Sequence, residues 1–468
     1  MEGIERMNEE FNQAELVRRD TERLKRYKEL LDFYHGSHWE GRERRNEKRL
    51  TFNYAKVFID KVTSYLMSGN SLVVEPLAGT DEARARAEKA AAALHQVAED
   101  NNLEQLDFET EIDCAILGDA CYKVIWDQEA KRVSITAPDI QGIYTWWVGD
   151  DTSKVWRLAS KYSLTQDMTK SLYQVNAKEK TASITEVWTE RDFELWIDDT
   201  RLEKKANPYG FIPFVIYPNL REPKQFWGVS DLTNIMEAQR ELNRATSQLS
   251  KILELSGNPI AVLENVEESE DIAVRPGAVW NIPEEAKAYL LDLLQGGGVS
   301  LHIDYINLLY RILHDLSESP RAAFGGTERD LSGVALEIEL QPLLQKVRRK
   351  RIIRTAAYIQ RNRLILKLLE KYRNESFGEN RLGVVWAPVL PQDLTTLVTN
   401  EQILIQSGIH SRRRAMDEVG VKDPEMEFSR WLEERETILK MNKELNSAPA
   451  RGSARGRAAE PRTEAIEE

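Results

Sequence analysis

Two stretches of helical pattern, 231–255 and 300–318, limit the fold of this chain more than any other feature of its sequence. In each stretch the apolar residues recur with the spacing of one helix face, and Gly257 and Pro320 stand where the patterns stop. At the usual rise per residue the first helix would be about 37 Å long. Residues 259–298 between them form an island of short strand-like runs around an acidic loop. The pattern therefore predicts a helical hairpin that carries a small domain at its tip.

The first of these helices has an unusual second face. Opposite its apolar residues, which include Leu242 and Leu249, the sequence places Asn, Gln, Ser, Thr and Arg side chains. Such a face suits a helix that is pressed against neighbours, or that borders water, better than a helix sunk in a core.

A second long pattern runs from about Gly333 to Tyr372 and reads as one helix interrupted at Pro342. An interior proline removes one backbone hydrogen bond and clashes with the preceding turn, so a kink at 338–342 is expected. The alternative is two helices, with Pro342 in the first turn of the second. The loop before this pattern contains two adjacent glycines, Gly325 and Gly326.

The rest of the chain divides into α-rich and β-rich parts. The first hundred residues are mostly helical in pattern, whereas 122–217 has the period of two that is typical of strands separated by turns. A further helical region follows at 393–445, and residues 446–468 have the composition of a disordered tail. The predicted fold class is α+β, mostly α. Six tryptophans of the β-rich insert are interpreted as packing residues in preference to a base-stacking platform: Trp126, Trp146, Trp147, Trp156, Trp188 and Trp196.

The charge balance argues against tight, unspecific binding of nucleic acid. The 468 residues include 64 Lys and Arg against 77 Asp and Glu, which gives a net charge of -13. DNA would be repelled by the chain as a whole and attracted at local basic patches alone. Both cysteines, Cys114 and Cys121, lie among apolar residues, which favours buried thiols over a disulfide or a metal pair.

The sequence contains no recognisable catalytic constellation. It lacks the common phosphate-binding and nucleophile motifs. His35 and His38 could share an ion, but turn residues are the better interpretation. Adjacent carboxylates in the acidic loop of the island could suggest a metal nuclease, yet such groups on one loop are usually a solvated surface. We therefore expect no enzyme activity, no cofactor and no metal site.

No targeting or membrane segment is recognisable. The first twenty residues are charged throughout and lack the apolar stretch of a secretory signal. No run of about eighteen apolar residues occurs, so no membrane association is expected. Such a protein should remain in a reducing cytoplasm or leave it by lysis.

Five segments occur in an order that is specific as a set, although no single one is decisive. They are "NYAKVFIDKVTSYLMSGN", "AILGDACYKVIWD", "NPYGFIPFVIYPN", "FWGVSDLTNIMEAQRELNRATSQLS" and "LSGVALEIELQPLLQKVRRKR", and together they cover roughly residues 50–375. In this ordered set the chain resembles the portal proteins of tailed bacteriophages, in the siphophage branch typified by phages of Gram-positive hosts.

In that family the subunits form a ring, normally of twelve, around an axial DNA channel, with regions called wing, stem, clip and crown. The resemblance implies a long-helix stem, a kinked wing helix, a β-rich wing insert and a helical crown. Carried onto this chain it gives a wing at 1–226, stem helices at 227–258 and 299–318, a clip at 259–298, a tunnel loop at 319–332, a kinked wing helix with its return at 333–392, a crown at 393–445 and a tail at 446–468.

The resemblance also implies roles for single residues. The part of the tunnel loop that would line the channel is Phe324, Gly325, Gly326, Thr327, Glu328, Arg329 and Asp330. Its two glycines would let the loop change shape around moving DNA, and Pro342 would turn the next helix outward into the wing. Partner docking at the clip is expected at Glu264, Glu267, Glu268, Glu270 and Asp271. Subunit contacts are expected at Leu242, Leu249, Arg348, Arg349 and Arg351. The whole basic run, including Lys350 and Arg354, is expected to pair with acidic neighbours between subunits rather than to grip DNA.

The implied partners are further copies of the chain, a terminase, a head-completion adaptor, a major capsid or scaffolding protein, and transiently held double-stranded DNA. The implied location is a capsid vertex of the virion, and the host cytoplasm during assembly. The alternative is another phage structural or adaptor protein with a helical hairpin and no DNA channel. A cytoplasmic enzyme is a third class, for which the sequence offers no support.

Overall fold

The computed structural model describes residues 11, 16, 18–43, 47–176, 179–257, 260–264, 287–291, 298–326, 333–390, 394–421 and 423–447. The chain consists of two compact units, Met1–Val389 and Leu390–Glu468. Helices predominate over strands, and the sheets are antiparallel. The expectation of a mostly α, α+β chain is therefore confirmed at the level of element content.

The N-terminal part of the first unit is helical, as predicted. Its helices are α3 (Thr21–Tyr34), α4 (Tyr54–Leu66), α5 (Asp81–Asp100) and α6 (Leu103–Leu117), with β1 (Asn70–Pro76) between α4 and α5. Side chains cap two of them: Asn53 accepts from the Lys56 amide at 3.1 Å, and Thr80 accepts from the Ala83 amide at 3.3 Å. These bonds satisfy amides that the first turn of a helix leaves unpaired.

The β-rich insert forms two sheets. A three-stranded sheet has the order β3 (Arg132–Thr136), β2 (Asp119–Asp127), β9 (Phe214–Pro218). A five-stranded meander consists of β4 (Ile143–Val148), β5 (Asp151–Thr165), β6 (Thr181–Thr189), β7 (Asp192–Ile197) and β8 (Thr200–Ala206), with η2 (Ile140–Gly142) before it and α7 (Gln166–Tyr173) between β5 and β6. The predicted insert at 122–217 is thus confirmed. The pattern missed β8, because every residue of this edge strand is exposed and most are polar, so no alternation is visible.

Packing accounts for several residues that the sequence singled out. Trp126 and Trp188 are 8 % and 6 % exposed, so the packing interpretation is confirmed for these two, while the other four tryptophans are half-buried. Cys114 and Cys121 are buried free thiols, as expected.

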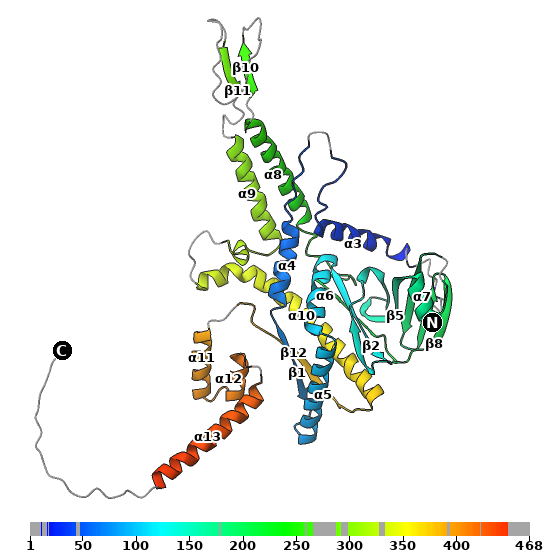
Figure 1. Ribbon diagram of the computed structural model, residues 1–468, viewed down its shortest axis with the longest axis vertical. Coiled ribbons are helices and arrows are strands. Elements are labelled where there is room, and N and C mark those ends of the chain that lie inside the picture. Colours follow the sequence, from blue (N-terminus) through cyan, green and yellow to red (C-terminus); the bar gives the residue numbers. More distant parts are fainter. Residues whose placement is uncertain are drawn as a thin grey trace, which may run out of the picture. The chain divides into compact units, whose positions relative to one another are not determined.

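The predicted hairpin is present. The helices α8 (Met236–Gly257) and α9 (Gly298–Leu316) pack side by side, and β10 (Ile260–Glu264) pairs with β11 (Lys287–Leu291) at the far end (Figure 1). However, α8 begins five residues later than the pattern suggested. The Ser230 hydroxyl accepts from the Leu232 amide at 3.1 Å and so supports a turn ahead of the helix rather than its first turn.

A single helix, α10 (Gly333–Arg373), runs through Pro342, so the alternative of two helices is wrong. Its first turns run in a different direction from its later ones, as Figure 1 shows by the change from yellow-green to yellow. The later turns pack on β2 and β9. After α10, the chain forms β12 (Asn380–Trp386), which pairs with β1.

Two apolar clusters form most of the core of the first unit. One joins α3, α4, the five-stranded sheet and the base of the hairpin, and the other joins α5, β2, β9 and α10.

The second unit contains α11 (Leu394–Gln406), α12 (Arg412–Glu418) and α13 (Pro424–Ser447), so the region 393–445 is helical as expected. The predicted disordered tail lies, from residue 448 on, outside the described residues.

Candidate functional site at the base of the hairpin

The hairpin leaves the body of the first unit through a tight crossing of two backbones. Gly118 ends α6 with a φ of +99°, and a Cβ at this position would lie 2.9 Å from the amide nitrogen of Ser230. A Cβ at Gly228 would lie 2.4 Å from the Gly118 carbonyl oxygen. Glycine is therefore required at both positions. The crossing fixes residues 228–232, which lead into α8.

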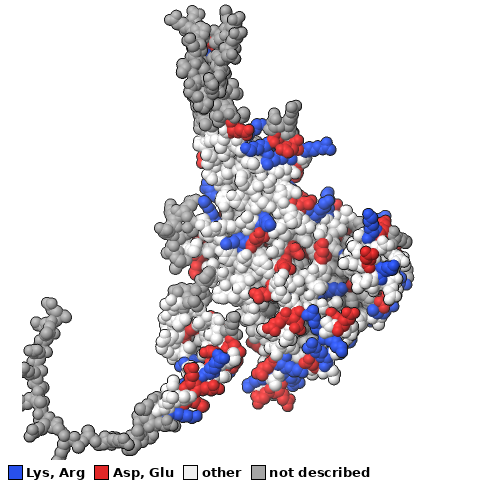
Figure 2. Space-filling model, in the orientation of Figure 1, with Lys and Arg blue, Asp and Glu red and all other residues white. Residues whose placement is uncertain are grey.

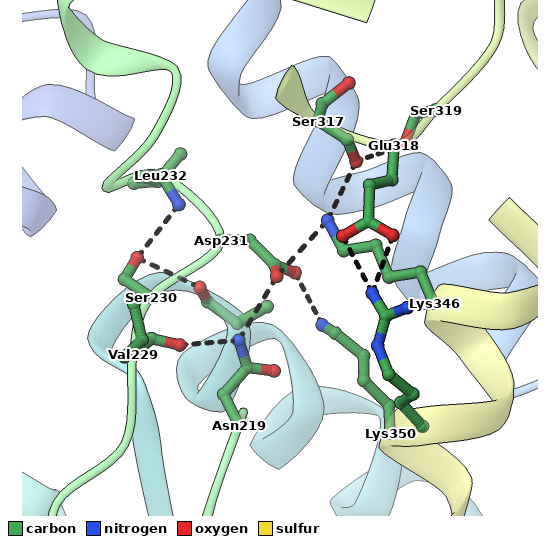
Figure 3. A network of polar contacts seen from close by, with 12 residues as sticks. Asn219, Val229, Ser230, Asp231, Leu232, Ser317, Glu318, Ser319, Lys346 and Lys350 are labelled. Carbon is green, nitrogen blue, oxygen red and sulfur yellow. Dashed lines mark hydrogen bonds and ion pairs between the residues drawn. The ribbon is translucent and has the colours of Figure 1, made fainter. Parts of the chain in front are cut away.

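Asp231 in this segment is the centre of a buried ion network (Figure 3). Lys346 Nζ lies 3.3 Å from its Oδ1, Lys350 donates to Oδ2, and the Asn219 amide donates to Oδ1 at 3.2 Å. Burial opposes ionisation of Asp231, but the two lysines outweigh it and hold the pKa of the carboxyl well below its usual value. Asp231 is therefore a permanent anion between two cations of α10.

Lys346 connects the two ends of the hairpin. Its ammonium group donates to the Ser317 carbonyl at 3.0 Å, where α9 ends, and pairs with Asp231, just before α8 begins. Burial lowers the pKa of Lys346, and the neighbouring Lys350 lowers it further, while Asp231 raises it. Both hairpin ends are thus attached to α10 through one buried amine.

Two further cations, Arg354 and Arg361, follow Lys346 and Lys350 along α10. Arg354 donates to both oxygens of Glu111 on α6, at 2.8 and 2.6 Å, and to the carbonyl oxygen of Asn219 at 2.6 Å. Arg361 forms a buried pair with Asp107, also on α6. The charged face of α10 therefore points into the subunit, and each cation has a carboxylate or carbonyl partner there, as buried charges require.

This placement corrects part of the prediction for the basic run. A contact between subunits is wrong for Lys350 and Arg354, because both are fully buried and paired within the chain. Arg349 pairs with Glu318 and stays half exposed, and Arg351 donates to carbonyl oxygens of neighbouring segments. For Arg348, which is exposed, and for Arg349 and Arg351, a subunit contact stays a prediction.

The polar face of α8 binds an extended segment of the same subunit. The Gln239 amide donates to the Phe52 carbonyl at 2.7 Å, and the Asn243 side-chain oxygen accepts from the Phe52 amide at 3.0 Å. One turn further, the Ser247 hydroxyl accepts from the Leu50 amide at 3.0 Å. The Asn, Gln and Ser residues that indicated contacts with neighbours therefore have partners within the chain.

The two leucines expected at a subunit interface differ in their burial. Leu242 is 2 % exposed and belongs to the apolar cluster at the hairpin base, so its assignment to a subunit interface is wrong. Leu249 is half-buried, and its contact with another subunit stays a prediction.

An apolar stripe on α9 remains exposed in the single chain. Leu301, Tyr305, Leu308 and Leu316 are 72 %, 40 %, 48 % and 45 % exposed, and the half-buried Ile312 lies between the last two. Their spacing of three and four residues places them on one face of the helix. On the face shown in Figure 2, the hairpin has few charged side chains, whereas Lys, Arg, Asp and Glu are intermixed over the five-stranded sheet and the free end of α5. The sequence pattern alone did not separate this exposed row from the apolar row that packs inward, because apolar residues lie on both faces of α9.

The described part of the predicted tunnel loop packs against the hairpin base. The short helix η3 (Arg321–Phe324) places the Phe324 ring 5.2 Å from the ring of Phe58 and 5.3 Å from that of His314, measured between centroids. Gly325 follows with a φ of +82°, which favours glycine. The Phe324 side chain is thus held within the subunit, in contrast to its expected place in a channel lining. Thr327, Glu328, Arg329 and Asp330 lie outside the described residues.

At the tip of the hairpin, one of the predicted docking residues is described. Glu264 is exposed at the end of β10, opposite Lys287 of β11, and its Oε1 accepts from the Tyr289 hydroxyl at 3.1 Å. Glu267, Glu268, Glu270 and Asp271 lie outside the described residues, as does the strand-like run at 277–282.

Neither a metal centre nor a membrane-spanning helix is found in the described part of the chain. No three His, Cys, Asp or Glu side chains there are grouped so that they could hold an ion. Among the same residues, no helix combines the length and apolarity needed to cross a bilayer. His38, one of two histidines considered as ligands, is buried and bonded to Phe33 and Asn243.

The sequence of nearly the whole chain, residues 13–441, matches the family model described as "Phage portal protein, SPP1 Gp6-like". The chain belongs to this family of phage portal proteins. The expected resemblance is thereby confirmed, and with it the portal function. Portal proteins of this family are structural components of the virion that assemble into oligomeric rings and associate with capsid and terminase. A comparison with curated proteins gave no significant match.

Proposed function

We propose that twelve copies of the chain form a ring around an axial channel at one capsid vertex. The genome is packaged and ejected through this channel and retained by it, and the same ring joins head to tail. The hairpin is the stem, its tip is the clip, and the second unit is the crown. The portal has no chemistry of its own, because ATP hydrolysis belongs to the terminase that docks on the clip.

The apolar stripe on α9 is the observation that supports this arrangement best. Apolar surface of this kind is costly to leave in water, and contiguous exposed apolar rows usually mark contacts with other proteins. In a ring each subunit offers one face to the neighbour on one side and a different face to the neighbour on the other. A second copy of the chain is therefore the occupant of the stripe, which replaces Leu242 as the stem contact.

Contacts with the other partners involve two further sets of residues. At the tip of the hairpin, Glu264 with Glu267, Glu268, Glu270 and Asp271 forms an acidic surface for the terminase and later for the head-completion adaptor. The other contact is with DNA: Thr327, Glu328, Arg329 and Asp330 contact its backbone transiently, without reading bases. A major capsid or scaffolding protein binds outside the stem.

Electron microscopy of the purified protein tests the ring. The parent should give rings with a central hole, and Leu308→Asp should give single subunits, because a carboxylate in the stripe cannot be desolvated against a neighbour. Asn307→Asp, which places the same charge on the next exposed residue, is the matched control and should keep rings. If Leu308→Asp formed rings as readily as this control, the stripe would not be the subunit contact.

A further inference from the structure

The end of α9 contains a residue in an unfavourable backbone conformation. The helix closes with two backbone bonds, from the Ser319 amide to the His314 carbonyl and from the Glu318 amide to the Asp315 carbonyl, both at 3.1 Å. This pair of bonds is the Schellman motif, in which the residue after the cap is left-handed and is usually glycine. Here that residue is Glu318, with a φ of +51°. A side chain at this conformation is strained against the backbone, so something else must favour glutamate.

The side chain of Glu318 explains the choice of residue. Its two carboxylate oxygens accept from Nη2 of Arg349 on α10, at 2.7 and 2.6 Å. One turn earlier on the same helix, Lys346 donates to the carbonyl oxygen of the preceding residue, Ser317. Two cations of α10 therefore hold two consecutive residues of the α9 end, as Figure 3 shows for Lys346, Ser317 and Glu318. A glycine would relieve the strain but would remove one of these attachments.

The attachment through Lys346 shares its carboxylate with a second lysine. Asp231 is shared by two lysines, and the second of them, Lys350, also lies 3.9 Å from Glu111. The five buried groups Lys346, Lys350, Arg354, Asp231 and Glu111 comprise three cations and two carboxylates. Lys346 is the cation whose partners can be lost while Asp231 remains paired through Lys350.

The released turn has an obvious lower-strain conformation. If Glu318 changed to the right-handed region, α9 could continue by a residue or two and would stop before Pro320, because the residue before a proline disfavours the helical region. Residues 320–326 follow directly, and their Phe324 ring packs on His314 of the same helix. Lengthening α9 would therefore move residues 320–326, which follow it.

We propose that the end of α9 is a strained latch, held in its left-handed turn by Arg349 and Lys346 of α10. When α10 shifts, the two cations release the turn, Glu318 relaxes, and the movement passes to residues 320–326. The latch goes beyond the proposed function, because it is a property of one subunit and needs neither ring nor DNA. In a ring it would link the position of α10 to that of residues 320–326.

Hydrogen exchange of the full chain tests the latch through three variants. Glu318→Ala keeps the strained conformation and removes the carboxylate, so amides of 316–324 should exchange about tenfold faster than in the parent. Arg349→Met removes the other partner and should have the same effect. Glu318→Gly removes the carboxylate and the strain together, so its turn should exchange as slowly as in the parent.

The matched control is Arg363→Met, which removes an exposed arginine further along α10 and should leave the exchange of 316–324 unchanged. All proteins are compared in the same oligomeric state, measured by size exclusion, so that failure of ring formation is seen separately. Parent-like exchange in Glu318→Ala and Arg349→Met would overturn the latch, because the ion pair would not be holding the turn. Equal opening in Glu318→Gly and Glu318→Ala would overturn the role of backbone strain.

Discussion

The side-chain amide of Asn243 donates to Nδ1 of His38 at 2.8 Å, and both residues are buried between α8 and the turn after α3. On the other side of the His38 imidazole, Nε2 lies 2.9 Å from the Phe33 carbonyl oxygen, which can only accept a hydrogen bond. The imidazole is therefore neutral, with its proton on Nε2. Burial lowers the pKa of His38, the bond that its ring donates to the Phe33 carbonyl opposes this effect, and nearby Arg240 lowers the pKa further.

Acidification should therefore destabilise the hairpin base through His38. A histidine whose pKa is lowered by folding contributes stability above its unfolded pKa, and the contribution is lost as pH falls below about 6.5. Asn243→Asp should invert the sign, because a carboxylate facing Nδ1 favours the charged ring. Thermal unfolding of the parent and of Asn243→Asp is measured between pH 8 and pH 5. The melting temperature of the variant, relative to that of the parent, should rise as pH falls. If the difference in melting temperature stayed constant across this range, His38 would not be the cause of the pH dependence.

Asp119 should act in the opposite direction at a different place. It accepts from the Tyr27 hydroxyl and the Gly228 amide, each at 2.7 Å, and burial raises its pKa to about 6. A carboxyl whose pKa is raised by folding contributes stability at low pH, and this contribution is lost as pH rises through 6. Compared with Asp119→Asn, the parent should gain about 1.4 kcal/mol between pH 7.5 and pH 5, measured by urea unfolding. A parallel pH dependence of the two proteins would contradict the raised pKa.

Removing one partner of the buried Glu111–Arg354 pair should destabilise the protein much more than replacing both partners. Arg354→Met leaves Glu111 buried without its main partner and should lower the free energy of unfolding by about 3–5 kcal/mol. The double variant with Glu111→Met should recover most of this loss. Arg84→Met, which breaks an exposed pair with Asp81, is the control and should change stability by less than about 1 kcal/mol. Additive losses in the double variant would show that the two side chains are not coupled.

Leu242 should behave as a core residue, in contrast to Leu308. Leu242→Ala leaves a cavity at the hairpin base and should lower the free energy of unfolding by about 2–5 kcal/mol. Leu308→Ala removes an exposed side chain and should leave the stability of the isolated subunit nearly unchanged, although it weakens rings. Chemical unfolding at a concentration where the protein is monomeric separates the two. Equal losses would mean that the exposed stripe is covered within the subunit.

Stiffening the loop after Phe324 should impair DNA handling without preventing assembly. Gly325→Val puts a β-branched residue at a φ of +82°. Gly326→Val, made in the same protein, adds a Cβ that would lie 2.8 Å from the flexible Arg321 side chain. Particles built with this portal should protect less genome from nuclease, while electron microscopy shows normal rings. Parent-like protection would mean that the loop does not work on DNA by changing shape.

The sequence was most informative where the structure is periodic. The hairpin helices, α10 and the strands of the insert other than β8 were predictable, because each buries one face with a fixed repeat. The basic run was read as exposed, since neither Asp231 nor Glu111 is near it in the chain, and a charged stripe along a helix usually faces water. The polar face of α8 misled for the same reason: its partners at Leu50 and Phe52 are backbone groups almost 200 residues away.

The pairing of β1 with β12 has a consequence for the order in which the chain can fold. Asn70 lies opposite Trp386, more than 300 residues later, and β12 is the partner of β1 in this two-stranded sheet. During synthesis β1 therefore waits with an unpaired edge until almost the whole first unit has left the ribosome, and contacts of such long range form slowly. Nascent chains that end before residue 380 would keep this edge open to other strands. The fold of the first unit therefore closes this edge only when residues 380–386 have been made.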